Sequence, residues 1–490
     1  MIQNLPLDPI DLDEFLVRIR DSIPFNEKFA NPFFYLVKPT YENLSKYTLL
    51  VPKSYLFFAL ELLTFGLRIL LNFVLSIGAS IIHFWPRGAY GANLQDKKEF
   101  LFVSHFTQAQ DPEKEDAYFG SLINLQQDFV FYLNHTRINA KKLLSKFEKQ
   151  EKFNLVFNSK SLLPIQILLL QISQTRVSGW LFFQSLLMEN LLIEERRIML
   201  RAAVWQHSRA TMANFTLKNR LTKSILKIEP KFLVLPLEGH AHEAMIINLR
   251  QSNFKDLRIL GYQHAPLVPG QKNILRIVSS LGFNDYCLTS GEIPKLHILS
   301  IAPKCKVTVL GSRKHTNSKD YYKTLSQIQV LIAPEGTEES LLSFIELVNQ
   351  LSLLLPNSYL ILRPHPGLNT KITTNLLKNL KSNKNVSIST SSLSEDLKNS
   401  HFVLFRSSAV GIEGLSWGAQ PIHLDPMRDN SLNPMALSDF PNISCADAKD
   451  ISVLINNFDP KFFSSTEFQS SCYSYFNSYF GRLGDIKTLA

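Results

Sequence analysis

The residues best suited to chemistry form the run Arg363-Pro364-His365-Pro366, which follows an apolar segment typical of a β-strand. The two prolines restrict the turn, so the side chains of Arg363 and His365 are expected at the strand end. An imidazole held there donates a hydrogen bond to a phosphate oxygen, and in its protonated form it neutralises charge on a leaving phosphate. A surface histidine between prolines is the alternative, but few structural constraints demand this order of residues. We therefore predict a phosphate contact at this turn.

Two other strand-to-helix turns could receive the same anion. Gly336 and Thr337 stand where a strand meets a helix, and backbone N–H groups at a helix start bind phosphate oxygens. The full glycine fingerprint of dinucleotide sites is missing, so a capped helix is an alternative. Ser407 and Ser408 follow a later strand, and Glu413 lies in the glycine-containing helix start after them. Tight helix–sheet packing would also explain the small residues here. We expect these five residues to contribute to a nucleotide-sugar site.

A candidate base lies in the first half of the chain, where Glu238-Gly239-His240 ends a strand and opens a helix. A carboxylate there could take a proton from an acceptor hydroxyl. The alternative is that Glu238 only favours the helix dipole. His240, His242 and Glu243 lack the H-E-x-x-H spacing, so no metal site is predicted.

Further polar residues follow two other predicted strands. Gln263 and His264 come after the next strand, and with His240 they are candidates for contacts with an acceptor or sugar. The acid-rich loop Asp111–Gly120 contains Asp116, a second candidate catalytic carboxylate. A solvated loop is the alternative interpretation of this segment.

The elements that must position these residues alternate between short apolar runs and helical stretches, a pattern typical of βαβ units around parallel sheets. Ligands bind at the carboxyl ends of such strands, where all the candidate residues stand. The first predicted series of strands is Phe100–Ser104, Phe129–Leu133, Asn154–Phe157, Lys231–Pro236 and Arg258–Gln263. The second series is Lys306–Leu310, Gln329–Ala333, Ser358–Arg363, Val386–Ile388, His401–Phe405 and Gln420–Leu424. We predict an α/β protein with two Rossmann-like lobes facing a cleft.

Four segments follow from this pattern. Residues 1–98 form an N-terminal helical segment, 99–305 an acceptor lobe, 306–465 a nucleotide-sugar lobe, and 466–490 a helix packing back across the lobes. Residues 315–319 suit a linker or loop. The long helical region Leu162–Gln206 is expected to bury Trp180, Phe182 and Phe183 in the core.

The stretch Tyr55–Trp85 is long and apolar enough for a membrane-spanning helix. Glu61, Arg68, Asn72 and His83 interrupt it at a cost in hydrocarbon, so a helix pair lying on a membrane surface or covering the enzyme is equally compatible. Residues 1–10 lack the basic-then-apolar order of a secretory signal, and the four cysteines are widely spaced. We expect a cytoplasmic protein, peripheral at the inner face of the cell membrane.

The combination of E-G after one strand, H-P after another and S-S before a later helix resembles bacterial GT-B transferases that use CMP-activated acidic sugars. These are the sialyltransferases and the capsule-type Kdo transferases. The Y-F-G, G-Y-Q-H and R-P-H-P landmarks are also similar to surface-carbohydrate biosynthesis proteins, and the resemblance covers about Phe100 to Phe480. It implies that His365 contacts the CMP phosphate, that Ser407 and Ser408 bind phosphate or the sugar carboxylate, and that Glu238 is the base. The residue before Glu238 is Leu237 where those families carry a second acid, which leaves the base less firmly assigned.

The resemblance implies transfer of a Kdo-like or nonulosonic acid sugar (sialic, pseudaminic or legionaminic acid) to a capsule, lipopolysaccharide or lipid-linked acceptor, without cofactor or metal. Asp116 would serve if the reaction retained anomeric configuration. The alternatives are use of a UDP- or GDP-sugar, nucleotide-sugar epimerisation, and a non-catalytic scaffold of polysaccharide assembly. The net charge of +10 suits anionic partners. No motif of nucleic-acid-binding proteins accompanies that charge, so nucleic acid is not expected as a partner. The sequence indicates no oligomeric state.

Overall fold

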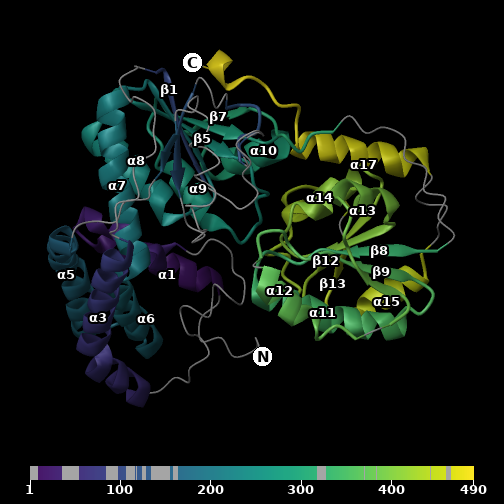
Figure 1. Ribbon diagram of the computed structural model, residues 1–490, viewed down its shortest axis with the longest axis horizontal. Coiled ribbons are helices and arrows are strands. Elements are labelled where there is room, and N and C mark those ends of the chain that lie inside the picture. Colours follow the sequence, from purple (N-terminus) through teal and green to yellow (C-terminus); the bar gives the residue numbers. More distant parts are fainter. Residues whose placement is uncertain are drawn as a thin grey trace.

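Two α/β lobes lie side by side, each built around a parallel sheet (Figure 1). This computed structural model describes residues 9–35, 55–83, 98–105, 116, 118–123, 128–133, 155–157, 164–316, 327–368, 370–381, 383–441, 443–458 and 465–489. The predicted arrangement of two Rossmann-like lobes is confirmed.

The N-terminal lobe contains a seven-stranded sheet in the order β3-β2-β1-β4-β5-β6-β7, with every neighbouring pair parallel. Its strands are β1 Phe100–His105, β2 Phe129–Leu133, β3 Leu155–Phe157, β4 Phe232–Pro236, β5 Arg258–Gln263, β6 Tyr286–Thr289 and β7 Lys306–Val309. The central strands are buried along almost their whole length. This explains their continuous apolar sequences, which are typical of parallel sheets covered on both faces.

The C-terminal lobe contains a six-stranded parallel sheet in the order β10-β9-β8-β11-β12-β13. Its strands are β8 Gln329–Ile332, β9 Tyr359–Leu362, β10 Val386–Ile388, β11 Phe402–Phe405, β12 Gln420–Leu424 and β13 Ile443–Cys445. The strand order reverses between β8 and β11, and a crevice for ligands forms at such a reversal in open α/β sheets.

Helices cover both faces of each sheet and close separate hydrophobic cores. In the first half of the chain they are α1 Pro9–Ser22, η2 Asn26–Ala30, η3 Pro32–Phe34, α3 Tyr55–His83, α5 Pro164–Leu187, α6 Ile193–Gln206, α7 Arg209–Ile228, α8 Ala241–Asn253, α9 Lys272–Ser279 and α10 Glu292–Ile301. In the second half they are α11 Glu338–Leu354, α12 Thr370–Leu377, α13 Leu393–Asn399, α14 Val410–Leu415, η4 Pro434–Leu437, α15 Ala448–Asn456, α17 Thr466–Tyr479 and η5 Ile486–Leu489.

The structure corrects the predicted boundary between the lobes. Residues 306–309 form β7, which pairs with β6 at the edge of the N-terminal sheet rather than opening the second lobe. The apolar pattern identified the strand but carries no information on which sheet it joins. β6 and β13 were not predicted.

The N-terminal helical segment is less separate than predicted. Leu12 and Phe15 of α1 and Phe34 of η3 lie in the same core as the N-terminal sheet, and Asp13 pairs with Arg276 of α9. The assignment of Phe183 to the core is wrong, because this side chain on α5 is 59% exposed. Helical periodicity shows which residues share a face, but not whether the protein covers that face.

The C-terminal chain returns from the second lobe to the first (Figure 1). The hydroxyl of Tyr479, at the end of α17, accepts a hydrogen bond from the backbone N–H of Leu267 in the N-terminal lobe at 3.0 Å. Beyond it, Arg482 forms a parallel bridge with Ser312, and Ile486 is buried in the core of the N-terminal lobe. Gly311 has φ +90°, and the backbone of Arg482 passes where a Cβ would stand. The C-terminal segment therefore ties the two lobes together.

We expect Tyr479→Phe to lower the midpoint of thermal unfolding, because it leaves the buried N–H of Leu267 without its partner, at a cost of about 1–3 kcal/mol. Differential scanning calorimetry measures the change. Tyr473→Phe on the same helix is the control, since no hydrogen bond of its hydroxyl occurs within the described part of the chain. Equal midpoints for the two variants would contradict a role of this contact in joining the lobes.

Candidate functional site

A cavity of about 480 Å³ lies between the two lobes. The N-terminal lobe contributes Tyr118, Tyr262 and His264, the chain between the lobes contributes Ser312, Arg313, Lys314 and Thr316, and the C-terminal lobe contributes Leu393, Ser394, Leu397, Glu413 and Trp417. Two of these side chains are cations and one is a carboxylate. The carboxyl ends of parallel strands of the N-terminal lobe border this cavity. Ligands bind at such ends in open α/β folds, so a ligand is expected here.

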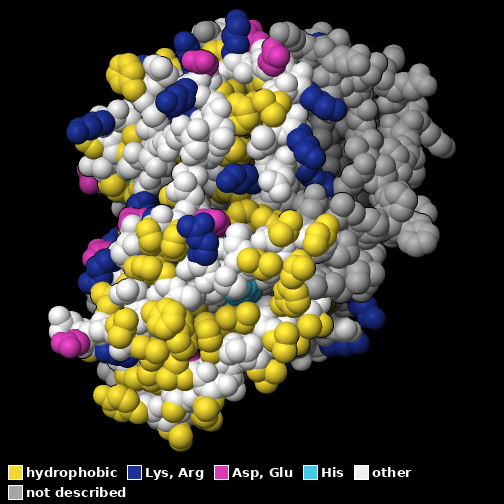
Figure 2. Space-filling model, turned by 90° about the vertical axis from the view of Figure 1, so that its left-hand side faces the viewer, with side chains coloured by type: hydrophobic (Ala, Val, Ile, Leu, Met, Phe, Trp, Pro, Cys, Tyr) yellow, Lys and Arg dark blue, Asp and Glu magenta, His cyan; other side chains and the backbone are white. Residues whose placement is uncertain are grey.

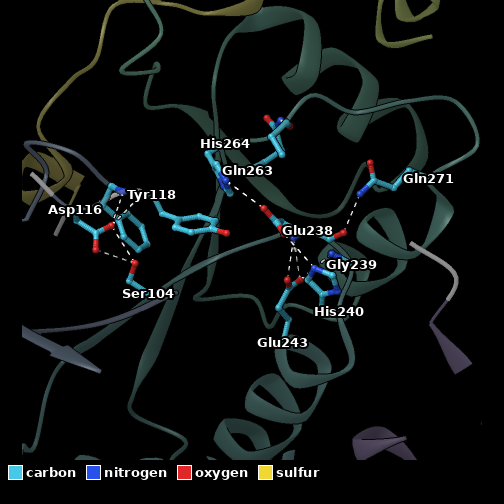
Figure 3. Close-up of polar contacts among 12 residues, drawn as sticks. Ser104, Asp116, Tyr118, Glu238, Gly239, His240, Glu243, Gln263, His264 and Gln271 are labelled. Atoms are coloured by element: carbon cyan, nitrogen blue, oxygen red, sulfur yellow. Dashed lines mark hydrogen bonds and ion pairs between the residues drawn. The ribbon is translucent and has the colours of Figure 1, made fainter. Parts of the chain in front are cut away.

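The turn that follows β4 is fixed by an internal carboxylate. Glu243, in the first turn of α8, is fully buried and accepts the backbone N–H groups of Glu238 and Gly239, each at 2.9 Å (Figure 3). Gly239 has φ +94°, a left-handed conformation that glycine adopts without strain. Burial raises the pKa of Glu243 to about 7, although the charge of His240 and the two backbone hydrogen bonds oppose this. The turn therefore requires Gly239 and the backbone N–H of residue 238, and it leaves the Glu238 side chain available for other contacts.

The Glu238 carboxylate lies between two imidazoles. Its Oε2 is 3.1 Å from Nε2 of His240, and its Oε1 is 3.2 Å from Nε2 of His264 (Figure 3). Burial favours the neutral acid, but the hydrogen bonds and charges of the two histidines outweigh it and hold the pKa of Glu238 well below its usual range. A carboxylate this acidic is a weak proton acceptor and a strong orienting group.

His264 connects this pair to the cavity. Its ring stands 4.7 Å from that of Tyr118, edge to face, and both side chains line the cavity. Donation from Nε2 to Glu238 leaves Nδ1 as the basic nitrogen, and this buried atom has no hydrogen-bond partner within the described residues. The arrangement matches the carboxylate–imidazole pairs in which the carboxylate selects the tautomer and the imidazole accepts the proton.

The side chains of Gln263 and Asp116 form hydrogen bonds inside the N-terminal lobe. The Gln263 amide is buried, where its oxygen accepts from the N–H and hydroxyl of Ser290 and its nitrogen donates to the carbonyl of Ala265. The fully buried Asp116 accepts from the hydroxyls of Ser104 and Tyr132 and from two backbone N–H groups. Neither side chain is among the residues that line the cavity, and these hydrogen bonds give both a structural role; the predicted sugar contact of Gln263 and catalytic role of Asp116 stay predictions.

His365 follows β9, as predicted, on an exposed turn. Its Nδ1 accepts the backbone N–H of Gly367 at 3.0 Å, which leaves Nε2 as the protonated, donating nitrogen. Desolvation lowers the pKa of His365; the charge of Glu335 opposes this shift, and the charge of Lys314 adds a smaller lowering. The imidazole is therefore neutral near pH 7, and not the cation considered from the sequence. Gly336 packs against it so closely that a Cβ there would lie 2.9 Å from Nδ1.

Arg363 is held by the C-terminal lobe itself. Its guanidinium pairs with Asp396 at 2.6 Å and donates to the hydroxyl of Ser389 and the carbonyl of Ser391. Thr337 accepts the N–H of Ser340 as the N-cap of α11, the role that the sequence suggested. These contacts give both residues a structural function whether or not a ligand binds.

A carboxylate of the protein occupies the predicted serine site. Glu335 accepts hydrogen bonds from the guanidinium of Arg406 at 2.8 Å and from the N–H and hydroxyl of Ser407, each at 3.1 Å. Ser408 accepts the N–H of Val410. Although burial favours its neutral form, the charge and hydrogen bonds of Arg406 and the hydroxyl of Ser340 lower the pKa of Glu335 to about 2. The donors at this helix start are thus ordered around a negative charge, as they would be around a phosphate.

Lys314 joins the link between the lobes to the C-terminal lobe through its ion pair with Glu413. Arg313 donates to the backbone carbonyl of Asp116 at 2.9 Å. The sequence did not single out either cation, nor the pair formed by Glu335 and Arg406. Glu335 and Arg406 follow β8 and β11, two strands that prove to be neighbours, so their contact was readable only once the strand order was known.

No group of three or more His, Cys, Asp or Glu side chains is placed to hold a metal ion in the part of the chain that the structure describes. The four cysteines are free thiols.

No family model and no curated protein matches the chain. Among solved structures, UDP-GlcNAc 2-epimerase from Neisseria meningitidis aligns with 78% of this chain and 97% of its own, at 14% identity and TM-score 0.46. A putative UDP-N-acetylglucosamine 2-epimerase from Listeria monocytogenes covers 78% and 92% at 11% identity and TM-score 0.47. The calicheamicin glycosyltransferase CalG4 covers 78% and 94% at 8% identity and TM-score 0.43. Similarities at this level identify no family and no substrate, so the function is inferred from the residues of the site.

The Glu335 site makes the stability of the C-terminal lobe depend on pH. Because its folded pKa of about 2 lies below the usual value near 4.5, its contribution is complete above pH 4.5 and is lost as the pH falls towards 2. The difference corresponds to about 3 kcal/mol. We expect Glu335→Gln to be less stable than wild type at pH 7 and to lose less stability on acidification, as measured by urea unfolding at several pH values. Glu346→Gln, exposed on α11, is the control. Parallel pH profiles for Glu335→Gln and wild type would disprove the assignment.

Proposed function

We propose that this protein is a glycosyltransferase that moves an acidic sugar from a CMP-activated donor to an acceptor hydroxyl. The observation that carries the proposal is a cavity between the lobes that is lined by an oriented imidazole, His264, and by two cations, Arg313 and Lys314. His264 comes from a strand end of the N-terminal lobe, whereas Lys314 belongs to the link and acts on His365 of the C-terminal lobe. Transfer from a nucleotide sugar needs a base on the acceptor side of the anomeric carbon and anion-binding groups on the phosphate side.

On the acceptor side, Glu238 and His264 act together. Glu238 stays ionised and fixes the imidazole, and Nδ1 of His264 takes the proton from the attacking hydroxyl. The developing positive charge on the ring is then stabilised by the carboxylate 3.2 Å from its other nitrogen. This revises the expectation that Glu238 is itself the base.

On the donor side, His365 offers its Nε2–H to a phosphate oxygen as a neutral donor. Lys314 supplies positive charge nearby, and Gly336 packs directly against the imidazole. These groups stabilise the negative charge that accumulates on the nucleotide phosphate as the glycosidic bond breaks. In that step the acceptor oxygen bonds to the anomeric carbon, the phosphate oxygen leaves with the bonding electrons, and the acceptor proton goes to His264.

The charge of the cavity supports an acidic sugar. Arg313 and Lys314 outnumber the single carboxylate, Glu413, among its lining residues. An uncharged hexose gives the guanidinium of Arg313 no anionic partner, whereas the carboxylate of an ulosonic acid fits it as a charge-assisted hydrogen bond. The acceptor is proposed to be a surface glycan or lipid-linked saccharide.

The donor class is tested by product formation with purified protein and a panel of activated sugars. CMP-sialic acid and CMP-Kdo should be turned over, and UDP-GlcNAc should not. Arg313→Ala should reduce kcat/KM for the acidic donors by about 10–100-fold, the loss of one charge-assisted contact. Turnover restricted to UDP- or GDP-sugars would refute the acidic-sugar proposal. Conversion of a UDP-sugar without any acceptor would identify an epimerase.

The base assignment is tested by single and double substitution. Glu238→Gln and His264→Asn should each lower kcat by about 10²–10⁴-fold, and the double variant should be no worse than the poorer single variant, because the two residues act as one unit. Lys231→Ala, exposed at the opposite end of β4, is the control. If Glu238→Gln were inactive while His264→Asn stayed active, Glu238 would be the base. Full glycan synthesis in cells by both variants and by His365→Ala would favour the scaffold.

A further inference from the structure

An exposed apolar surface covers the outer side of α3 and α5, at the end of the N-terminal lobe away from the cavity (Figure 1). We call it the α3–α5 surface, and its exposed side chains include Leu63, Leu67 and Leu71 of α3 and Ile165, Leu169 and Ile172 of α5. The two helices touch each other through the stacked rings of Phe65 and Phe182, 4.8 Å apart. Figure 2 shows hydrophobic side chains gathered over this part of the molecule. A soluble monomer rarely leaves so large an apolar area open to water.

The polar groups of α3 point inward. Glu61 is buried and bound by the guanidinium groups of Arg197 and Arg201 on α6, and the Asn72 amide donates to the carbonyl of Val204 at 3.2 Å. At 100° per residue, these two side chains share one face of α3 and the exposed leucines the opposite face. Glu61 and Asn72 therefore face the protein, and the exposed leucines face the surroundings.

The same inversion holds for α5. Gln171 and Ser178 are buried and bind the two ring nitrogens of His207, at 2.6 Å and 2.9 Å. Burial lowers the pKa of His207 to about 4, so the imidazole stays neutral inside the helical layer. The helices on the surface of a water-soluble protein turn their apolar face to the core and their polar face to solvent. α3 and α5 have the reverse arrangement.

We propose that the α3–α5 surface docks the protein into one leaflet of an anionic lipid membrane. The exposed side chains of the surface are overwhelmingly aliphatic, which suits hydrocarbon. Protein interfaces instead favour aromatic residues, Met and Arg, and leucine is under-represented among the residues that dominate their binding energy. Tyr55, 81% exposed at the start of α3, suits the boundary between headgroups and acyl chains.

The ion pairs of α3 determine that it lies in the leaflet and does not cross the bilayer. Its segment Phe58–Leu75 is long and apolar enough to span, with mean hydropathy 1.8 and only 6% of the segment buried. Spanning would separate Glu61 from Arg197 and Arg201 and place an unpaired carboxylate in hydrocarbon, at a cost of several kcal/mol. Docking through the outer face keeps every one of these contacts.

The charges near the surface select anionic lipid. Arg68 of α3 and Arg176 of α5 are exposed basic side chains on the two helices. Long basic side chains lay their methylene groups along apolar surfaces and extend their charge to phosphate headgroups. Their attraction adds about 1 kcal/mol per residue to the hydrophobic contribution on an anionic surface.

Flotation of the purified full-length protein with vesicles tests the proposal. The vesicles are phosphatidylcholine alone or phosphatidylcholine with 30% phosphatidylglycerol, roughly the range over which such surface charge becomes effective. We expect wild type to float with the anionic vesicles, and Leu63→Glu/Leu67→Glu to bind them at least ~10-fold more weakly, since two charges enter the apolar face. The matched control is Leu296→Glu/Leu353→Glu. These leucines are 63% and 71% exposed, against 80% and 66% for Leu63 and Leu67, and lie on α10 and α11.

Unfolding midpoints check that each double variant is folded, and a single substitution gives an independent readout. Tryptophan fluorescence of Leu67→Trp, after subtraction of the wild-type signal, should be quenched by brominated acyl chains, whereas that of Leu296→Trp should not. Equal binding of anionic vesicles by Leu63→Glu/Leu67→Glu and by the control variant would overturn the proposal. Quenching at neither tryptophan position would also overturn it. So would a stable dimer that ignores vesicles and dissociates on Leu63→Glu/Leu67→Glu, because the surface would then bind a second copy of the chain.

Discussion

The cavity depends on the way in which the chain ties together two lobes with separate hydrophobic cores. Each sheet buries its own apolar residues, and among the described residues only side chains at the margins, such as Leu437 and Ile293, pack against the core of the other lobe. The return of the chain after α17 adds direct contacts between the lobes. The hydroxyl of Tyr479 meets the backbone of Leu267, and Arg482 pairs with Ser312 next to the cavity-lining Arg313. Together with the backbone hydrogen bond from Gly270 to Ser431, this segment fixes the position of one lobe against the other.

Internal carboxylates prepare the turns around the cavity. Glu243 holds the turn that carries Glu238, Asp116 holds the turn before Tyr118, and Glu335 orders the donors at Ser407. Each accepts backbone N–H groups that would otherwise be unpaired in a buried place, which costs more than a lost surface hydrogen bond. The geometry of the site is therefore set before any ligand arrives, and less ordering has to accompany binding.

The sequence predicted the elements well and their partners poorly. The strands at 129–133, 258–263 and 420–424 were predicted at their observed bounds, because buried parallel strands have mostly apolar sequences bounded by polar loops. The edge strand β7 was identified but placed in the wrong lobe, since strand order depends on contacts distant in sequence. Glu238 and His264 were each singled out, but their contact follows from the pairing of β4 with β5, which no local pattern records. The roles of Glu335 and Asp116 were missed for the same reason.

The inverted polarity of α3 and α5 has a consequence for how variation in this protein should be interpreted. Within either lobe a charge in place of a buried leucine would leave an unpaired ion in the core and disrupt folding. On the outer face of these two helices the same change meets only solvent, so folding would tolerate it. At Glu61 the effect is the opposite. Leucine has a good helical propensity, but Glu61→Leu would leave the guanidinium groups of Arg197 and Arg201 without their carboxylate partner. The usual rule is that a change from an apolar to a charged residue harms folding more than the reverse change. On α3 and α5 we expect the opposite.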